Sequence, residues 1–320
     1  FGSSWLEHPP FFSVPRLLWR AKQGLMAADA RVLVRKAEQK LKPGLFRCLG
    51  GTSRFEEAAE LYKQAAVQFK LAKLWQEAAN CYTQCAYCAQ QCGDPAAEAE
   101  AHTEAGNILK RLSSRQAIEC FEQAVTLLSA AGRFQQAAKL LKAIAELHEA
   151  DGADAREAKA CYRRAVEMFE MDDHGKSSVT ACNLKVAELA AADGELQDAI
   201  KIFETEGEKA VRNSMLQYGA KEHLLKAGLL HVLRGDSVTT SIAVERYNGL
   251  DPRFASSREG ELLAGLAQAC EDGDVDAFVE RLNVYDSVTK LDAWKTDILL
   301  KIKNALRPPH GQSLESVDLS

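Results

Sequence analysis

The sequence has few of the residues that interrupt helices, with 8 prolines and 20 glycines in 320 residues. Long helices are therefore possible, and a collagen-like or linker-like chain is excluded. No run approaches the roughly 18 consecutive apolar residues of a membrane-spanning helix. Positive charge is not in excess either, because 40 Lys and Arg stand against 45 Asp and Glu. With a net charge of −5, we expect no nucleic-acid partner, and any basic contact must come from a local face.

The composition that is present is typical of a folded protein. Apolar residues make up 47% of the chain and charged residues 27%, so a large core can form and disorder is not expected. The nine cysteines are odd in number and form no paired framework. We therefore expect a reduced, cytoplasmic protein.

Four cysteines share one stripe of a predicted helix, at Cys81, Cys85, Cys88 and Cys92. Because a helix rises about 1.5 Å per residue, the outer two lie roughly 16 Å apart. Tetrahedral zinc needs each sulfur about 2.3 Å from one ion, which a straight helix cannot supply. We predict that these cysteines are small packing residues and that no metal is bound here.

Signatures of catalysis are missing. The sequence contains no HExxH, GxSxG or GxGxxG motif. Gly175-Lys176-Ser177 resembles the end of a phosphate-binding loop, but Glu170 occupies the place of the glycine that this motif requires. We interpret the segment as a turn between helices, and we expect neither an enzyme nor a cofactor.

The first 26 residues differ from the rest, with two of the four tryptophans and a single acidic residue. One interpretation is a targeting peptide, since Arg16, Arg20 and Lys22 accompany an aromatic, acid-poor stretch. The interpretation we prefer is a non-native or untranslated extension ahead of a start at Met26, because the stretch lacks the apolar core of a signal peptide.

From Phe55 onward one pattern recurs, in which a small residue is followed by a large apolar residue four positions later and by a small or apolar residue seven positions later. These positions lie on one face of an α-helix, so each occurrence predicts an amphipathic helix. The occurrences are Ala58/Tyr62/Ala65, Ala78/Tyr82/Cys85, Ala117/Phe121/Ala124, Ala137/Leu141/Ile144, Ala158/Tyr162/Ala165 and Ala199/Phe203. Their starts are spaced by 20, 39, 20, 21 and 41 residues, which indicates one helix per 20 residues and one hairpin per 40.

The predicted fold is all-α, a solenoid of tetratricopeptide-like helical hairpins in a twisted sheet of antiparallel helices. We assign residues 27–214 to this solenoid and 307–320 to a flexible tail. Residues 215–306 form a C-terminal helical bundle with helices at about 215–233, 238–249, 257–272, 275–287 and 291–306. Ser256 and Glu259 fit a capping box for the third of these helices.

Nine segments, in order along residues 29–320, resemble the α-SNAP family, the soluble NSF attachment proteins of the α/β type. The segments are GLFRCLGGTSRFEEA (44–58), FKLAKLW (69–75), EAGN (104–107), GRF (132–134) with AAK (137–139), LKVA (184–187), YGAK (218–221), SRE (257–259), YDS (285–287) with LDAW (291–294), and LLKIK (299–303).

The resemblance implies an adaptor. Proteins of this family bind the four-helix SNARE complex and recruit the hexameric ATPase NSF, which disassembles that complex after membrane fusion in vesicle-mediated intracellular transport. The SNARE-binding positions of the family correspond here to Arg133, Lys139, Lys185, Lys221, Lys226 and Arg258. Two further basic positions of the family are occupied by Ala181 and Glu261, which weakens the expected contact.

The resemblance also implies a membrane contact and an NSF contact. In the loop 44–53, Leu45, Phe46 and Leu49 are expected to touch an anionic membrane surface, so the protein is expected to be cytoplasmic and peripherally associated with membranes. The alternative is that Phe46 folds back onto the first hairpin. The expected NSF-binding and NSF-activating residues are Glu271, Asp272, Asp274, Asp276 and Leu319.

Two other classes of protein remain open. A generic tetratricopeptide-like scaffold that binds peptides would explain the repeat but not the C-terminal segments. A helical-repeat enzyme, such as a prenyltransferase subunit, would need metal ligands that the sequence does not offer.

Overall fold

The computed structural model describes residues 16–42, 52–152, 155–171 and 175–306, and within them it contains helices and no strand. The chain divides into two compact units, residues 1–154 and 155–320, which are described separately. The first unit holds α1 (Arg16–Leu41), α2 (Ser53–Leu71), α3 (Trp75–Cys92), α4 (Pro95–Leu109), α5 (Ser114–Ala130) and α6 (Phe134–Asp151). The second holds α7 (Ala155–Glu170), α8 (Lys176–Ala192), α9 (Leu196–Val211), α10 (Gln217–Arg234), α11 (Ser237–Leu250), α12 (Pro252–Ala255), α13 (Arg258–Asp272), α14 (Val275–Val288) and α15 (Ala293–Leu306).

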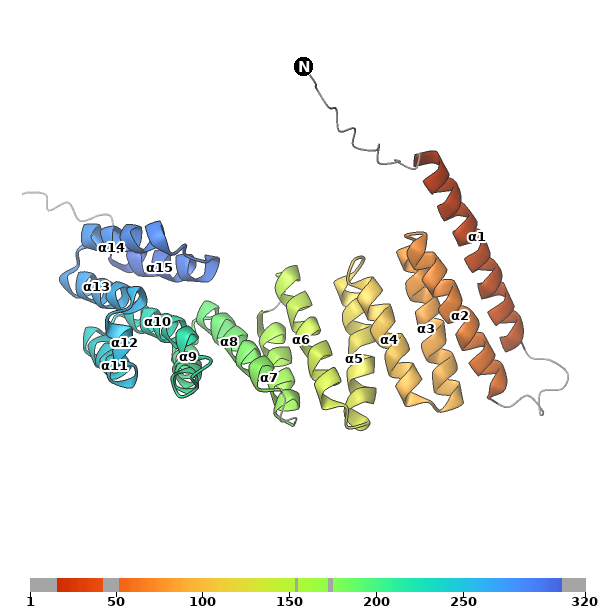
Figure 1. Ribbon diagram of the computed structural model, residues 1–320, viewed down its shortest axis with the longest axis horizontal. Coiled ribbons are helices and arrows are strands. Elements are labelled where there is room, and N and C mark those ends of the chain that lie inside the picture. Colours follow the sequence, from red (N-terminus) through yellow and green to blue (C-terminus); the bar gives the residue numbers. More distant parts are fainter. Residues whose placement is uncertain (1–15, 43–51, 153–154, 172–174, 307–320) are drawn as a thin grey trace, which may run out of the picture. The chain divides into compact units, whose positions relative to one another are not determined.

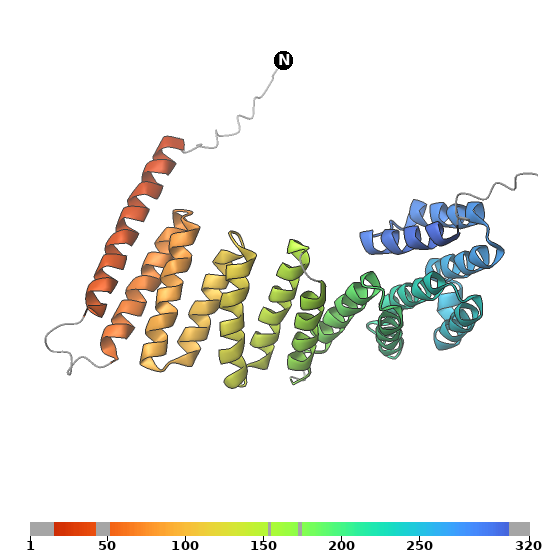
Figure 2. The ribbon, with the colours of Figure 1, turned by 180° about the vertical axis from the view of Figure 1, so that it is seen from behind.

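In the first unit each helix packs against the next one in the sequence, as antiparallel neighbours (Figure 1 and, from behind, Figure 2). The recurring small and large apolar positions form the core between them. In this unit these positions are at most 7% exposed, and Phe121 and Leu141 are fully buried. The sets on α7 and α9 belong to the second unit, where Tyr162 and Phe203 are fully buried. The predicted all-α architecture of helical hairpins is therefore confirmed.

The two long gaps in the repeat are filled by α4 and α8, which pack without a large apolar residue at the repeat position. Helix α4 uses Ala101, Ala105 and Gly106. A Cβ atom on Gly106 would lie 2.5 Å from the Phe121 ring, so glycine allows this close approach. Helix α8 packs through Val179, Cys182 and Val186, among others.

In the second unit the core surrounds α10, which contacts α9, α11, α13 and α15. Leu224 and Leu225 of α10 and Leu263 of α13 are at most 1% exposed and belong to this core. The expected C-terminal helices are found within two residues of their predicted bounds, and the short α12 was not predicted. The predicted cap was wrong by one residue: Ser257, not Ser256, accepts a hydrogen bond from the Gly260 amide, because Ser256 ends α12.

Candidate functional site

A groove between α4 and α6 carries the first pair of expected site residues. Gly132, with φ at 70°, lets the chain turn after α5, and Arg133 then forms the N-cap of α6. Arg133 and Lys139 are exposed and line the groove together with Glu100 and Glu104 of α4 and with Asp94, which caps α4. Within the described residues neither cation has an ion-pair partner. They are therefore available to an acidic partner.

The lysines of α2 are different, because α4 neutralises them. Lys63 Nζ lies 3.0 Å from Glu100 Oε1, and Lys70 Nζ lies 3.2 Å from Glu104 Oε2. The hydrogen bond that Lys63 donates to Glu100 raises the pKa of Lys63. Both pairs connect α2 to α4, and their residues are 37 and 34 positions apart in the sequence. In this unit, α6 rather than α2 presents uncompensated positive charge.

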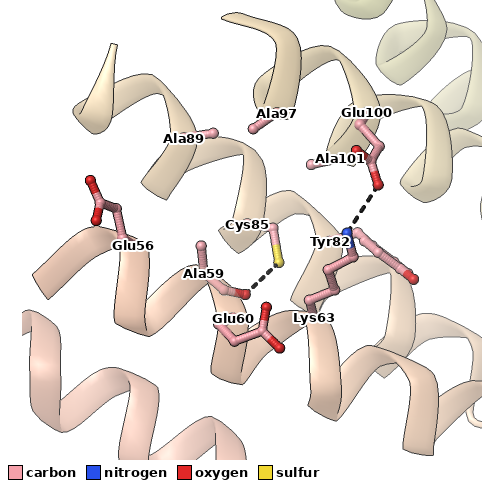
Figure 3. Close-up of a pocket in the computed structure, with 10 residues that line it drawn as sticks. All are labelled: Glu56, Ala59, Glu60, Lys63, Tyr82, Cys85, Ala89, Ala97, Glu100 and Ala101. Atoms are coloured by element: carbon pink, nitrogen blue, oxygen red, sulfur yellow. Dashed lines mark hydrogen bonds and ion pairs between the residues drawn. The ribbon is translucent and has the colours of Figure 1, made fainter. Parts of the chain in front are cut away.

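Three of the four cysteines of the α3 stripe lie inside the first unit, and Cys92, at the end of the helix, is partly exposed. Cys81, Cys85 and Cys88 are buried, and the Cys85 thiol donates to the Ala59 carbonyl oxygen at 3.3 Å (Figure 3). Burial raises the pKa of Cys81 and of Cys85 to about 12 and that of Cys88 to about 11. These thiols thus pack between helices, as expected. In the part of the chain that the structure describes, no group of three His, Cys, Asp or Glu side chains could hold a metal ion.

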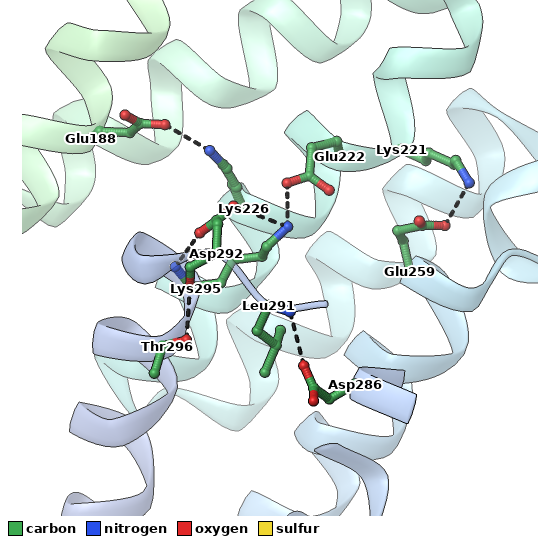
Figure 4. A network of polar contacts seen from close by, with 10 residues as sticks. All are labelled: Glu188, Lys221, Glu222, Lys226, Glu259, Asp286, Leu291, Asp292, Lys295 and Thr296. Atoms are coloured by element: carbon green, nitrogen blue, oxygen red, sulfur yellow. Dashed lines mark hydrogen bonds and ion pairs between the residues drawn. The ribbon is translucent and has the colours of Figure 1, made fainter. Parts of the chain in front are cut away.

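In the second unit, Lys185 and Lys226 meet at Glu188 of α8. Lys226 Nζ lies 2.7 Å from Glu188 Oε1, and Lys185 Nζ lies 3.6 Å from Glu188 Oε2 (Figure 4 draws the first pair). The Lys185 side chain remains 45% exposed, whereas that of Lys226 is only 12% exposed. The ammonium of Lys226 also lies 5.1 Å from the centre of the Trp294 ring. The positive charge of Lys226 is therefore largely neutralised by Glu188 and shielded from solvent by Trp294.

The same network attaches α15 to α8 and α10. Trp294 Nε1 donates to the Glu188 carbonyl oxygen at 3.3 Å. Lys295, only 4% exposed, lies 2.6 Å from Glu222 of α10 and 3.2 Å from Asp292 (Figure 4). Burial opposes the charge of Lys295, but its bonds to the two carboxylates raise its pKa overall. Breaking such a buried pair costs more than an exposed one, so the network stabilises the docking of α15.

Two further expected cations lie at α10 and α13. Lys221 Nζ is 2.9 Å from Glu259 Oε2, and its side chain is 42% exposed. Arg258 is exposed and donates to Thr289 Oγ1 at 2.9 Å. Ala181 and Glu261, at the two positions where the sequence departs from the family, are both exposed. Glu261 lies beside Arg258 in one shallow hollow and reduces the positive charge there.

The four expected acidic residues are brought together at the turn between α13 and α14, and all four are exposed. Glu271 and Asp272 end α13, Gly273 turns the chain with φ at 69°, and Asp276 lies in the first turn of α14. Asp274 accepts a hydrogen bond from the Ala277 amide at 2.9 Å and caps α14. One turn thus carries a dense negative charge.

Four expected residues, Leu45, Phe46, Leu49 and Leu319, lie outside the described residues. Beside the loop, Lys40 pairs with Glu57 of α2, and the Arg54 guanidinium lies 4.6 Å from the centre of the Phe55 ring. The contacts made by Glu188 and Glu222 were not foreseen. They join residues 38, 73 and 106 positions apart, and no local pattern announces them.

These observations define a helical-repeat protein whose two units carry exposed charged faces suited to contact with other proteins. The family model "Soluble NSF attachment protein, SNAP" matches residues 28–307. The chain belongs to this family, which confirms the resemblance seen in the sequence.

The alignments with similar proteins cover most of this chain and almost the whole length of each relative. The alpha-soluble NSF attachment protein of Vitis vinifera is 38% identical over 89% of this chain and 96% of its own. That of Mus musculus is 37% identical over 88% and 95%, and a probable vesicular-fusion protein sec17 homolog of Schizosaccharomyces pombe is 33% identical over 88% and 98%.

Among solved structures, a signal transduction ATPase with a tetratricopeptide repeat sensor from Pyrococcus horikoshii has a TM-score of 0.50 at 12% identity, over 90% of this chain and 46% of that one. That likeness shows the fold alone. Among the described helices, none combines the length and the apolar character needed to cross a membrane.

Proposed function

We propose that this protein is an adaptor that binds assembled SNARE complexes and recruits and stimulates NSF, which disassembles them after membrane fusion. The family match over residues 28–307 carries the proposal, and the names of the relatives refer to NSF attachment and vesicular fusion. A peptide-binding scaffold or an enzyme would not account for a match that extends through the C-terminal helices.

The basic residues provide the contact to the SNARE complex in this proposal. Arg133 and Lys139 have no ion-pair partner within the described residues and meet the acidic helical bundle directly. Lys185, Lys221 and Arg258 keep their contacts to Glu188, Glu259 and Thr289 and add the part of their side chains that remains exposed, and Lys226 acts mainly by holding α15 in place. An exposed ion pair contributes at most about 1 kcal/mol, so affinity comes from the sum of several contacts. The departures at Ala181 and Glu261 make the remaining cations more important.

Charge reversal tests this face. The double variant Lys139→Glu/Lys185→Glu should bind a recombinant SNARE complex roughly tenfold more weakly, and the loss should be larger at about 50 mM than at about 150 mM salt, because salt screens exposed pairs. Affinity is measured by titration, and circular dichroism checks the fold. Lys201→Glu/Lys301→Glu changes the net charge equally at exposed positions outside the proposed face and should have little effect. Unchanged affinity of the first variant at both salt concentrations would rule out the face.

The loop 44–53 is proposed to contact the membrane. Changing Leu45, Phe46 and Leu49 to serine should slow NSF-dependent disassembly on phosphatidylserine-containing liposomes, because shallow insertion of apolar side chains is lost. Disassembly of a soluble SNARE complex should stay at the unmodified rate. An equal loss in both assays would show that the loop serves the fold instead. The protein is proposed to be cytoplasmic, with this loop as its peripheral attachment.

The acidic turn between α13 and α14 is proposed to face NSF, together with Leu319. Carboxylates at one exposed turn attract a basic partner over several ångströms and accelerate its association. The part played by Leu319 is argued in the Discussion.

A further inference from the structure

A small hollow opens between α2, α3 and α4 (Figure 3). Its floor is apolar and is formed mainly by Ala59, Cys85, Ala89 and Ala101. Its volume is about 160 Å³, below the roughly 300–1,000 Å³ of sites that enclose a small molecule. The hollow therefore suits the end of one side chain of a partner rather than a metabolite.

The rim of the hollow is negative. Lys63 and Glu100 stand on the rim and neutralise each other at 3.0 Å. Glu56 and Glu60 also stand on the rim and are exposed. Glu60 Oε1 accepts a hydrogen bond from the side-chain Nε2 of Gln64 at 2.9 Å, but neither Glu56 nor Glu60 has an ion-pair partner within the described residues. The rim therefore has a net negative charge, which attracts a positively charged group.

The hollow adjoins the groove that carries Arg133 and Lys139, since α4 forms a wall of both. Glu100 of α4 lines both, so α2, α4 and α6 contribute to one face of the first unit. Along this face, uncompensated charge changes from negative at α2 to positive at α6. A helical bundle lying across the face meets both signs in a fixed order.

We propose that the hollow receives a lysine or arginine side chain of the same SNARE bundle whose acidic residues meet α6. This inference rests on the function proposed above. The methylene stem of such a side chain covers the alanines and Cys85, and its cation reaches Glu56 and Glu60. A bundle turned end for end would set like charges against each other at both places, so the face selects the direction of the bundle.

The experiment compares two double variants against a recombinant SNARE bundle. Glu56→Lys/Glu60→Lys should bind roughly tenfold more weakly, because two attractive contacts become repulsive. Glu119→Lys/Glu167→Lys makes the same change of net charge at exposed positions on α5 and α7 and should stay within about twofold of the unmodified protein. Circular dichroism and thermal unfolding verify that both variants fold.

A second series uses bundles in which single exposed lysines or arginines are changed to glutamate. Some of these bundles should regain affinity for Glu56→Lys/Glu60→Lys, which is the coupling that a double-mutant cycle detects. The compensating positions should cluster toward one end of the bundle.

The possible results separate the two proposals. If the unmodified protein does not bind the bundle, the proposed function fails and this inference fails with it. If it binds, but the two double variants lose affinity equally or not at all, only the hollow is overturned. Compensation at both ends of the bundle would contradict the selection of one direction.

Discussion

The variant Leu319→Ala should bind the SNARE complex and recruit NSF almost as the unmodified protein does, but lose most of its stimulation of the ATPase and of disassembly. Under the proposed function, carboxylates near α13 and α14 hold NSF, while Asp318-Leu319 acts at the end of the chain. Burying one leucine contributes about 1.5–3 kcal/mol. That energy biases an ATPase between two states by about tenfold or more.

Leu314→Ala is the matched control, since it removes the other leucine of the same tail. It should leave ATPase stimulation unchanged, and Leu319→Met should restore much of it, because methionine keeps the apolar volume. ATPase rates and disassembly of a fluorescent SNARE complex are the measurements. Normal disassembly with Leu319→Ala would make the tail assignment wrong, and the adaptor proposal would then rest on the remaining sites.

Replacing Gly228 with alanine should destabilise the second unit by about 1–3 kcal/mol, the usual cost of overpacking a core. A Cβ atom at this position of α10 would lie 2.2 Å from Cδ2 of Leu263, a fully buried residue of α13. The leucine cannot swing out without leaving the core. The free energy of unfolding, measured in urea, reports the loss.

Gly219, also on α10, supplies the control. Nothing lies within 4 Å of its added Cβ atom, so Gly219→Ala should be neutral or stabilise the helix by up to about 1 kcal/mol. Equal stability of the Gly228 and Gly219 variants would show that α13 does not pack against α10 as closely as the structure has it.

The helical repeat was readable from the sequence because helix packing depends on local periodicity. Each set of the Ala58/Tyr62/Ala65 type lies within one helix, and its spacing places all its residues on the buried face. Helices α4 and α8 left only a gap in the pattern, since Gly106 and Cys182 pack there without a large apolar residue. The cap of α13 was misplaced by one residue because the short α12 gave no periodic signal.

The family membership and the positions of the charged residues were likewise determined by the sequence alone, since ordered short segments identify a family without any contact being known. What each charge does was decided only by the tertiary structure. Arg133 remains unpaired within the described residues, whereas Lys226, equally basic in the sequence, is held by Glu188 and covered by Trp294. Glu56 and Glu60 border a hollow that exists only because α3 and α4 pack beside them. The contacts that Glu188 makes with Lys226 and Trp294 join residues 38 and 106 positions apart in the sequence. Such residues come into contact only when the helices pack together.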